Sequence, residues 1–171
     1  MPVILSVRGF MPEIGEQCFV AENATIVGEV VCGEKCSFWF NAVVRGDVNK
    51  IKIGDEVNIQ DGAIIHGTFK AADTIIGNRV SVGHNAIVHG CTIEDEVLIG
   101  MGAIVMDNAV IGKGSVIGAG AIVLAGTKVP PNSVYAGIPA KKVKDADASH
   151  WEIIRRTADN YPMYASWFDK K

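Results

Sequence analysis

The hydrophobic positions of this chain recur every six residues over most of its length. From Ile93 the sequence divides into IEDEVL, IGMGAI, VMDNAV, IGKGSV, IGAGAI and VLAGTK, and each block starts with Ile or Val. The same frame runs upstream through the blocks that start at Val20, Ile53 and Ile76. An amphipathic helix would repeat about every 3.6 residues and a half-buried strand every two. A period of six therefore predicts short strands joined by sharp turns.

Three such blocks predict one triangular coil, and stacked coils form an all-β parallel solenoid. The repeats cover about residues 20–140, within a predicted solenoid domain of residues 1–145. The blocks of five successive coils are expected to open at Cys32/Phe38/Val44, Ile53/Ile59/Ile65, Ile76/Val82/Val88, Ile93/Ile99/Val105 and Ile111/Ile117/Val123. The frame slips at residues 47–50, 68–74 and 91–92. The first two slips are extra residues, which we expect to leave the solenoid as loops, where binding residues tend to lie.

The last part of the chain, residues 146–171, has a different pattern. Its apolar residues lie near helical spacing, which predicts a helix from about residue 146 to 167 packed along the outside of the solenoid. Ser149 is the expected N-cap, and Pro162 is expected to break or kink the helix. The apolar positions are Trp151, Ile154, Ala158, Tyr161, Tyr164 and Trp167.

Composition limits the classes of partner. A net charge of −3 in 171 residues gives no general reason to expect binding to nucleic acid or to an anionic membrane. No apolar run approaches the roughly 18 residues that span a bilayer, and the N-terminal segment does not resemble a secretory signal. We therefore expect a cytoplasmic protein.

Four cysteines are expected to be free thiols in such a compartment: Cys18, Cys32, Cys36 and Cys91. Cys32 and Cys36 have the spacing C-x3-C, which could be half of a metal site. The six-residue frame turns both side chains inward, which favours plain burial.

Three of the four histidines fall between Ile64 and Gly90. His66 and His89 each follow the residue that opens a third block, so they should stack in neighbouring coils, about 4.8 Å apart. His84 belongs to a second block and should lie over Asp61, at another part of the coil. A neighbouring chain in a three-fold assembly could bring its His84 to the pair. The alternative is that all three are surface residues. His150, at the start of the predicted helix, is expected to be a structural or a surface residue.

Three neutral imidazoles with an open fourth position would describe a catalytic zinc site. Gln60 could hydrogen-bond the water or the substrate there. Arg45, Asp47 and Asp61 could form ion pairs, across subunits, that fix the ligand geometry.

The segments NAVVRGD, NIQDGAIIH and VGHNAIVHG resemble the gamma-class carbonic anhydrases, a family of left-handed β-helices built from hexapeptide repeats. The resemblance implies a homotrimer that hydrates CO2 reversibly to bicarbonate with zinc at the subunit interface, although imidazole ligands also accept iron or cobalt. It implies that His66 and His89 bind the metal together with His84 of the next subunit. It also assigns site roles to Arg45, Asp47, Gln60 and Asp61, and to Tyr161 on the C-terminal helix.

The chain departs from the family's archetype at the proton shuttle, which uses acidic residues in and near an extended loop. Here Asp47 is followed by Val48, and the segment after His66 is the short GTFKAAD. Two other functions therefore stay open. The ending VYAGIPAKKVK also resembles hexapeptide-repeat acyltransferases, which use an acyl-CoA and one histidine as general base. A catalytically idle, metal-binding trimer is the third alternative.

Overall fold

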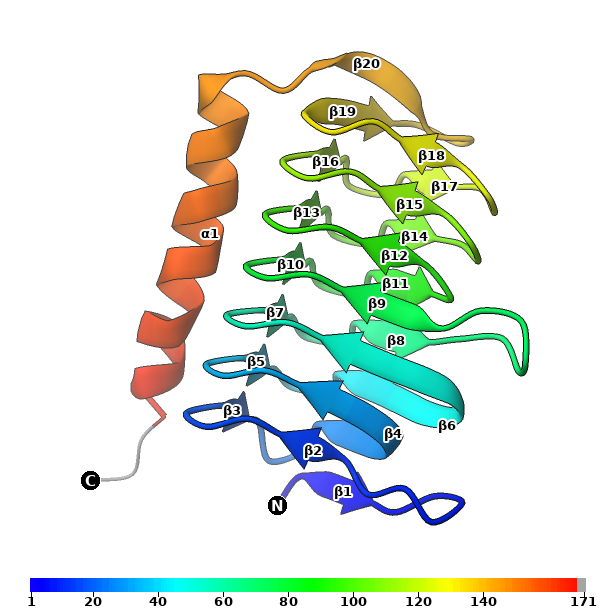
Figure 1. Cartoon of the computed structure of the whole chain (residues 1–171). Helices are drawn as coiled ribbons and strands as arrows, with labels where there is room; N and C mark the ends of the chain where they lie inside the picture. Colours follow the sequence, from blue (N-terminus) through cyan, green and yellow to red (C-terminus); the bar gives the residue numbers. More distant parts are fainter. Residues whose placement is uncertain (169–171) are drawn as a thin grey trace.

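A computed structural model describes residues 1–168, which form a parallel β-solenoid with one helix along its side (Figure 1). The strands of successive coils stack in register along three faces. Within residues 1–168, no helix is both long and apolar enough to cross a membrane.

Two faces of the solenoid belong to one 12-stranded sheet, because the long strands β4 and β6 turn from one face to the next. The face that carries the histidine pair has β8 and β11 at its centre, and we call it the histidine face. The strands of this sheet are β1 Val3–Leu5, β2 Glu13–Ile14, β4 Thr25–Cys32, β6 Val43–Ile53, β8 Ile64–His66, β9 Thr74–Ile76, β11 Ile87–His89, β12 Thr92–Ile93, β14 Ile104–Val105, β15 Val110–Ile111, β17 Ile122–Val123 and β18 Lys128–Val129.

The third face is an eight-stranded sheet, and the helix α1 packs against its strands β5 and β10. Seven strands are parallel, and β20 closes the stack by pairing antiparallel to β19. The strands are β3 Phe19–Val20, β5 Ser37–Phe38, β7 Asn58–Ile59, β10 Ser81–Val82, β13 Leu98–Ile99, β16 Val116–Ile117, β19 Ser133–Ala136 and β20 Lys141–Asp145.

The strand register confirms the six-residue frame. Val44 pairs with Ile65, Ile65 with Val88, and Val88 with Val105, as the blocks require. All fifteen residues expected to open the blocks are buried in the core. Each coil needs its neighbour to pair its backbone groups, so the fold is a single continuous core of stacked aliphatic side chains.

The expected loop at residues 47–50 is wrong. These residues continue strand β6, which extends without a break from Val43 to Ile53. The coil below is lengthened as well, and β4 pairs with β6 on both sides of an irregularity at Gly28–Val30. Because both coils carry extra residues at the same corner, their backbone groups pair with each other and stay in the sheet. The second expected loop is confirmed, since residues 67–73 leave the solenoid between β8 and β9.

The C-terminal helix α1 spans Ala148–Ser166, and it differs from the prediction at its start. Its N-cap is Asp147, not Ser149, because the Asp147 carboxylate accepts hydrogen bonds from the backbone N–H groups of Ser149 and His150. The His150 side chain in turn accepts from the Asp147 N–H, so this histidine has the structural role expected of it. The helix is not broken at Pro162. Residues 169–171 of the predicted segment lie outside the described residues.

Replacing a core aliphatic residue should destabilise the protein strongly. Ile99 is fully buried between neighbouring coils, so Ile99→Ala should lower the free energy of unfolding by about 2–5 kcal/mol. Urea unfolding would measure this. Val143→Ala is the control, because Val143 on β20 is 62% exposed and its truncation should change stability little. Equal effects of the two variants would contradict this account of the core.

Candidate metal centre

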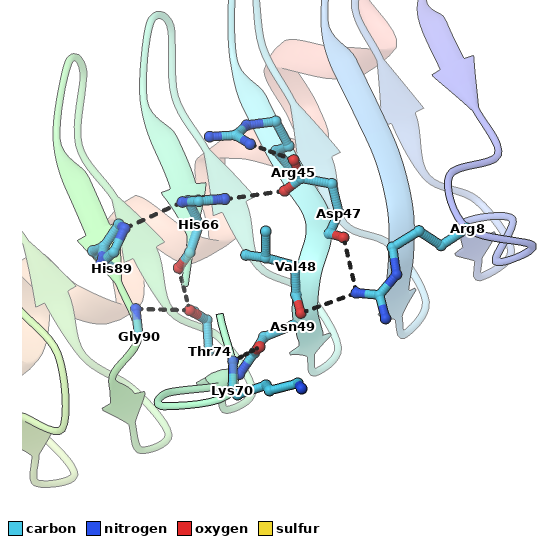
Figure 2. A network of polar contacts seen from close by, with 10 residues as sticks. All are labelled: Arg8, Arg45, Asp47, Val48, Asn49, His66, Lys70, Thr74, His89 and Gly90. Atoms are coloured by element: carbon cyan, nitrogen blue, oxygen red, sulfur yellow. Dashed lines mark hydrogen bonds and ion pairs between the residues drawn. The ribbon is translucent and has the colours of Figure 1, made fainter. Parts of the chain in front are cut away.

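His66 and His89 face each other on the histidine face. His66 ends β8 and His89 ends β11, and the two residues are register partners in the parallel pair. The Nδ1 atom of His66 lies 3.2 Å from the Nε2 atom of His89 (Figure 2). The sequence frame therefore placed this pair correctly.

The other nitrogen of each ring is held by a carboxylate. Asp47 on β6 places its Oδ1 atom 3.0 Å from Nε2 of His66. Asp107, which follows β14, places its Oδ1 atom 2.5 Å from Nδ1 of His89. Each imidazole thus has one nitrogen bound to a carboxylate and the other directed at its partner ring. This is the arrangement that orients histidine ligands in metal sites.

Further contacts fix the two carboxylates in place. Arg45 forms an ion pair with Asp47, with 2.5 Å between Nη1 and Oδ2. The Thr68 hydroxyl donates to the second oxygen of Asp107. Arg45 and Asp47 therefore pair within one chain, whereas the sequence predicted ion pairs across subunits.

The segment that leaves the solenoid is anchored on the same side of the molecule. The Thr74 hydroxyl donates to the His66 carbonyl and accepts from the Gly90 N–H (Figure 2). The Asn49 side chain accepts from the Lys70 N–H, 2.8 Å away. Arg8 donates to the carbonyl oxygens of the strand residues 47 and 48. The backbone around the histidine pair is therefore held from three neighbouring segments.

The pKa shifts of the histidine and the carboxylates favour the protonation states that bind a metal cation. Burial lowers the pKa of His66 and outweighs the opposing hydrogen bond to Asp47, which favours a neutral imidazole at neutral pH. Burial alone would raise the pKa of Asp47, but hydrogen bonds from His66 and Arg45 lower it overall. The pKa of Asp107 is lowered in the same way, by Thr68 and His89 against the effect of burial. Neutral imidazole is the form that binds metal ions.

The pair has the spacing that a shared metal ion requires. Two nitrogens bound to one tetrahedral zinc ion at about 2.0–2.1 Å lie about 3.3 Å apart, and here they are 3.2 Å apart. Within residues 1–168 no third histidine joins this pair to form a three-ligand group. At this place, one chain therefore brings together two of the three imidazoles that the sequence predicted for a metal site.

His84 lies at a different part of the coil, as the frame predicted. It follows β10 on the eight-stranded face, and its Nδ1 atom is 2.9 Å from Asp61 in the coil below. Both side chains are 42% exposed. The predicted stacking of His84 over Asp61 is correct, and Asp61 pairs with His84 in its own chain.

An aromatic cavity of about 310 Å³ adjoins His84 and Asp61. Tyr161 from α1 lines it and packs edge-on against Trp39, with 5.3 Å between the ring centroids. Burial, followed by the charge of Asp61, raises the pKa of the Tyr161 hydroxyl, which therefore stays protonated as a hydrogen-bond donor. The other lining residues are Tyr164, Trp167 and Phe168.

Gln60 precedes Asp61 in the chain and follows β7, and its side chain is buried. Its Nε2 atom donates to Asn58 over 3.0 Å, and Asn58 donates to Ser81 in the next coil. This polar ladder between coils satisfies the buried amide in place of water. The chain thus carries two separate histidine groups, His66 with His89 and His84 with Asp61 and Tyr161, which we call the His66/His89 half-site and the His84 half-site.

Comparison with known proteins identifies the family. A mitochondrial gamma carbonic anhydrase 1 of Arabidopsis thaliana is 37% identical over 95% of this chain. A carbonic anhydrase of Geobacillus kaustophilus is 45% identical over 90% of this chain and 86% of its own length. The chain belongs to the gamma carbonic anhydrase family. The present chain spans 61% of the length of the Arabidopsis relative.

The chain is also similar to other proteins that are built from hexapeptide repeats. Residues 90–125 match the bacterial transferase hexapeptide family (six repeats). A crystal structure of a hexapeptide transferase family protein from Anaplasma phagocytophilum superposes with a TM-score of 0.93, at 36% identity, over 97% of this chain and 98% of that one. An N-acyltransferase of Bacillus cereus, AntD, is 17% identical with a TM-score of 0.61 and shares the fold.

Sequence reasoning missed Asp107, whose carboxylate binds His89, and Thr68, whose hydroxyl donates to Asp107. A signal for Asp107 was present, because it comes two residues after Val105, the register partner of Val88. Its side chain therefore starts one coil away from His89. Thr68 had no such signal, since it lies in the segment where the six-residue frame is lost.

Proposed function

We propose that this chain is a zinc-dependent carbonic anhydrase-like lyase that hydrates CO2 reversibly at sites completed between the subunits of a homotrimer. The observation that carries the proposal is the His66–His89 pair, with ring nitrogens 3.2 Å apart and a carboxylate behind each ring. Stacked surface histidines without such a role would not need two carboxylates to orient them. Family membership gives independent support.

The third ligand in this proposal is His84 of the next subunit. His84 is 42% exposed and is oriented by its own carboxylate, Asp61, as His66 and His89 are by theirs. Three histidines, each with a carboxylate partner, make a uniform donor set, which a three-fold axis could assemble three times. Iron and cobalt are the other ions that such a set accepts.

A metal ion bound by three neutral imidazoles lowers the pKa of water to about 7 and so supplies hydroxide at neutral pH. The chain's own residues prepare the site for this chemistry. Asp47, Asp61 and Asp107 orient the imidazoles and keep their donor nitrogens directed outward. Tyr161 remains a protonated hydroxyl beside His84, where it can hydrogen-bond a small polar substrate. The aromatic cavity beside it suits an apolar molecule such as CO2.

The deciding experiment is stopped-flow CO2 hydration by protein loaded with a single metal ion, with metal content measured per trimer. We expect activity with about three ions per trimer, one per interface. No hydration with zinc, iron or cobalt at full occupancy would overturn the proposed activity and leave a metal-binding trimer without catalysis.

Proton export should limit the rate of this enzyme. The segment after His66 offers no run of acidic residues, so a proton leaving the site depends on soluble buffer. We expect kcat to rise with imidazole buffer concentration at constant pH and ionic strength, while kcat/KM stays constant. A kcat independent of buffer would show that a side chain of the protein performs this transfer.

Acyl transfer is a second candidate, favoured by the 36% identical hexapeptide transferase family protein. It predicts that acetyl-CoA raises the melting temperature of the metal-free trimer. Carbonic anhydrase function predicts no such shift, and a shift that persists in His89→Ala would favour acyl transfer at a separate site.

A further inference from the structure

Three cysteines interrupt the aliphatic core at one corner of the first two coils. The positions four residues apart at this corner carry Ile53/Val57, Ile76/Val80 and Ile93/Val97 in the three coils above, and all six side chains are buried. The first two coils carry Ile14/Cys18 and Cys32/Cys36 at the same register positions. In the two coils beyond these, buried serines, Ser115 and Ser133, occupy the second of the two positions. Among the described coils, only the first two place thiols at this corner, and there three of them come together.

The three sulfur atoms converge on one point. Each Sγ atom of Cys18, Cys32 and Cys36 lies within 4.8 Å of the other two. Three sulfurs bound at about 2.3 Å to one tetrahedral ion lie about 3.8 Å apart, so a shift of less than 1 Å would bring them to ligand distance. All three are free thiols in the structure. A disulfide would join only two of the three sulfurs.

The cluster is open to solvent on one side. Cys18 is half-buried, and together with Cys36 it lines a cavity of about 510 Å³ near the C-terminal end of α1. Lys35 lines the same cavity and places a positive charge near the thiols. Cys32 and Cys36 are buried, so Cys18 is the most accessible of the three. A metal ion that enters from the cavity would meet the Cys18 sulfur first, with the two buried thiols beneath it.

We propose that Cys18, Cys32 and Cys36 form a second metal site, a three-thiolate site for a thiophilic ion such as Zn²⁺ or Cu⁺. Thiolate ligands select these ions over hard cations. Three protein ligands leave one coordination position to the cavity, where water or a small thiol can bind. The site is separate from the histidine half-sites and does not depend on the proposed carbonic anhydrase activity.

Cobalt(II) tests this proposal, because thiolate ligands give it a strong charge-transfer absorption in the near ultraviolet and imidazole ligands do not. The fully reduced protein, titrated with Co²⁺ under anaerobic conditions, should develop this band to an intensity of one thiolate-bound ion per chain, in addition to any Co²⁺ that the histidines bind. Cys18→Ser should abolish most of it, and Cys32→Val and Cys36→Val should do the same. Cys91→Ala is the matched control, since Cys91 is buried alone at another corner, and it should keep the full band.

A second measurement covers the case in which the buried variants fail to fold. In the unmodified protein, Zn²⁺ should slow alkylation of Cys18 by iodoacetamide more than tenfold, while an excess of chelator restores the rate. Absence of the charge-transfer band at saturating Co²⁺, or alkylation that Zn²⁺ does not slow, would overturn the proposal. Neither readout involves CO2 hydration, so failure here leaves the proposed function untouched.

Discussion

His89→Ala should release the metal from the His66/His89 half-site and reduce CO2 hydration to the uncatalysed rate. The reason is geometric: the 3.2 Å nitrogen pair becomes a single imidazole, and one chain then offers one ligand in place of two. Metal content and stopped-flow hydration would be measured on the same samples. The solenoid should stay folded, because the His89 side chain lies outside the aliphatic core.

A second prediction concerns Asp107, the carboxylate that orients His89. Asp107→Asn keeps the shape of the side chain but weakens the acceptor of the His89 Nδ1–H, which orients the ring and raises its basicity. We expect the metal affinity or kcat/KM to fall about 10–100-fold. Asp95→Asn is the control, because Asp95 accepts hydrogen bonds from the backbone N–H and the side-chain amide of Asn78 at another corner, away from the histidines. Equal metal affinity in Asp107→Asn and wild type would contradict the proposed role of the carboxylate.

Much of this architecture could be predicted from the sequence because a solenoid converts spacing directly into position. Once the six-residue frame is known, Ile65 and Val88 must stack, and His66 and His89 must be neighbours. The separation of His84 from His89, only five residues away in the sequence, follows from the same frame. Regular backbone hydrogen bonding between coils leaves little freedom for any other arrangement.

The predictions from the sequence are wrong where two residues compete for one role, or where two neighbouring coils are lengthened at the same corner. Residues 47–50 looked like a loop in a single coil, yet β4 below is lengthened at the same corner and pairs with them. Ser149 and Asp147 are both good N-cap residues, and the choice fell to Asp147 because its carboxylate accepts two backbone N–H groups. Cys18 was not connected to Cys32 and Cys36, because it precedes the first clear repeat at Val20.

The contacts that no pattern gives are those between side chains on different coils and on the helix. The aromatic cavity beside His84 joins Trp39 of the second coil to Tyr161 of α1, more than a hundred positions apart in the chain. The sequence nominated Tyr161 only through the family resemblance. The structure adds the histidine group to which Tyr161 belongs, the one with His84 and Asp61.

Complementation between two inactive variants tests this shared site most directly. His84→Ala keeps the His66/His89 half-site, and His89→Ala keeps the His84 half-site, so neither homotrimer can complete a three-histidine site. When the two are unfolded together in equal amounts and refolded, each mixed trimer should contain one interface with both halves intact. Random assembly then restores about a quarter of the wild-type CO2 hydration activity and metal content. Mixed trimers that form but remain inactive and metal-free would contradict a site shared between subunits.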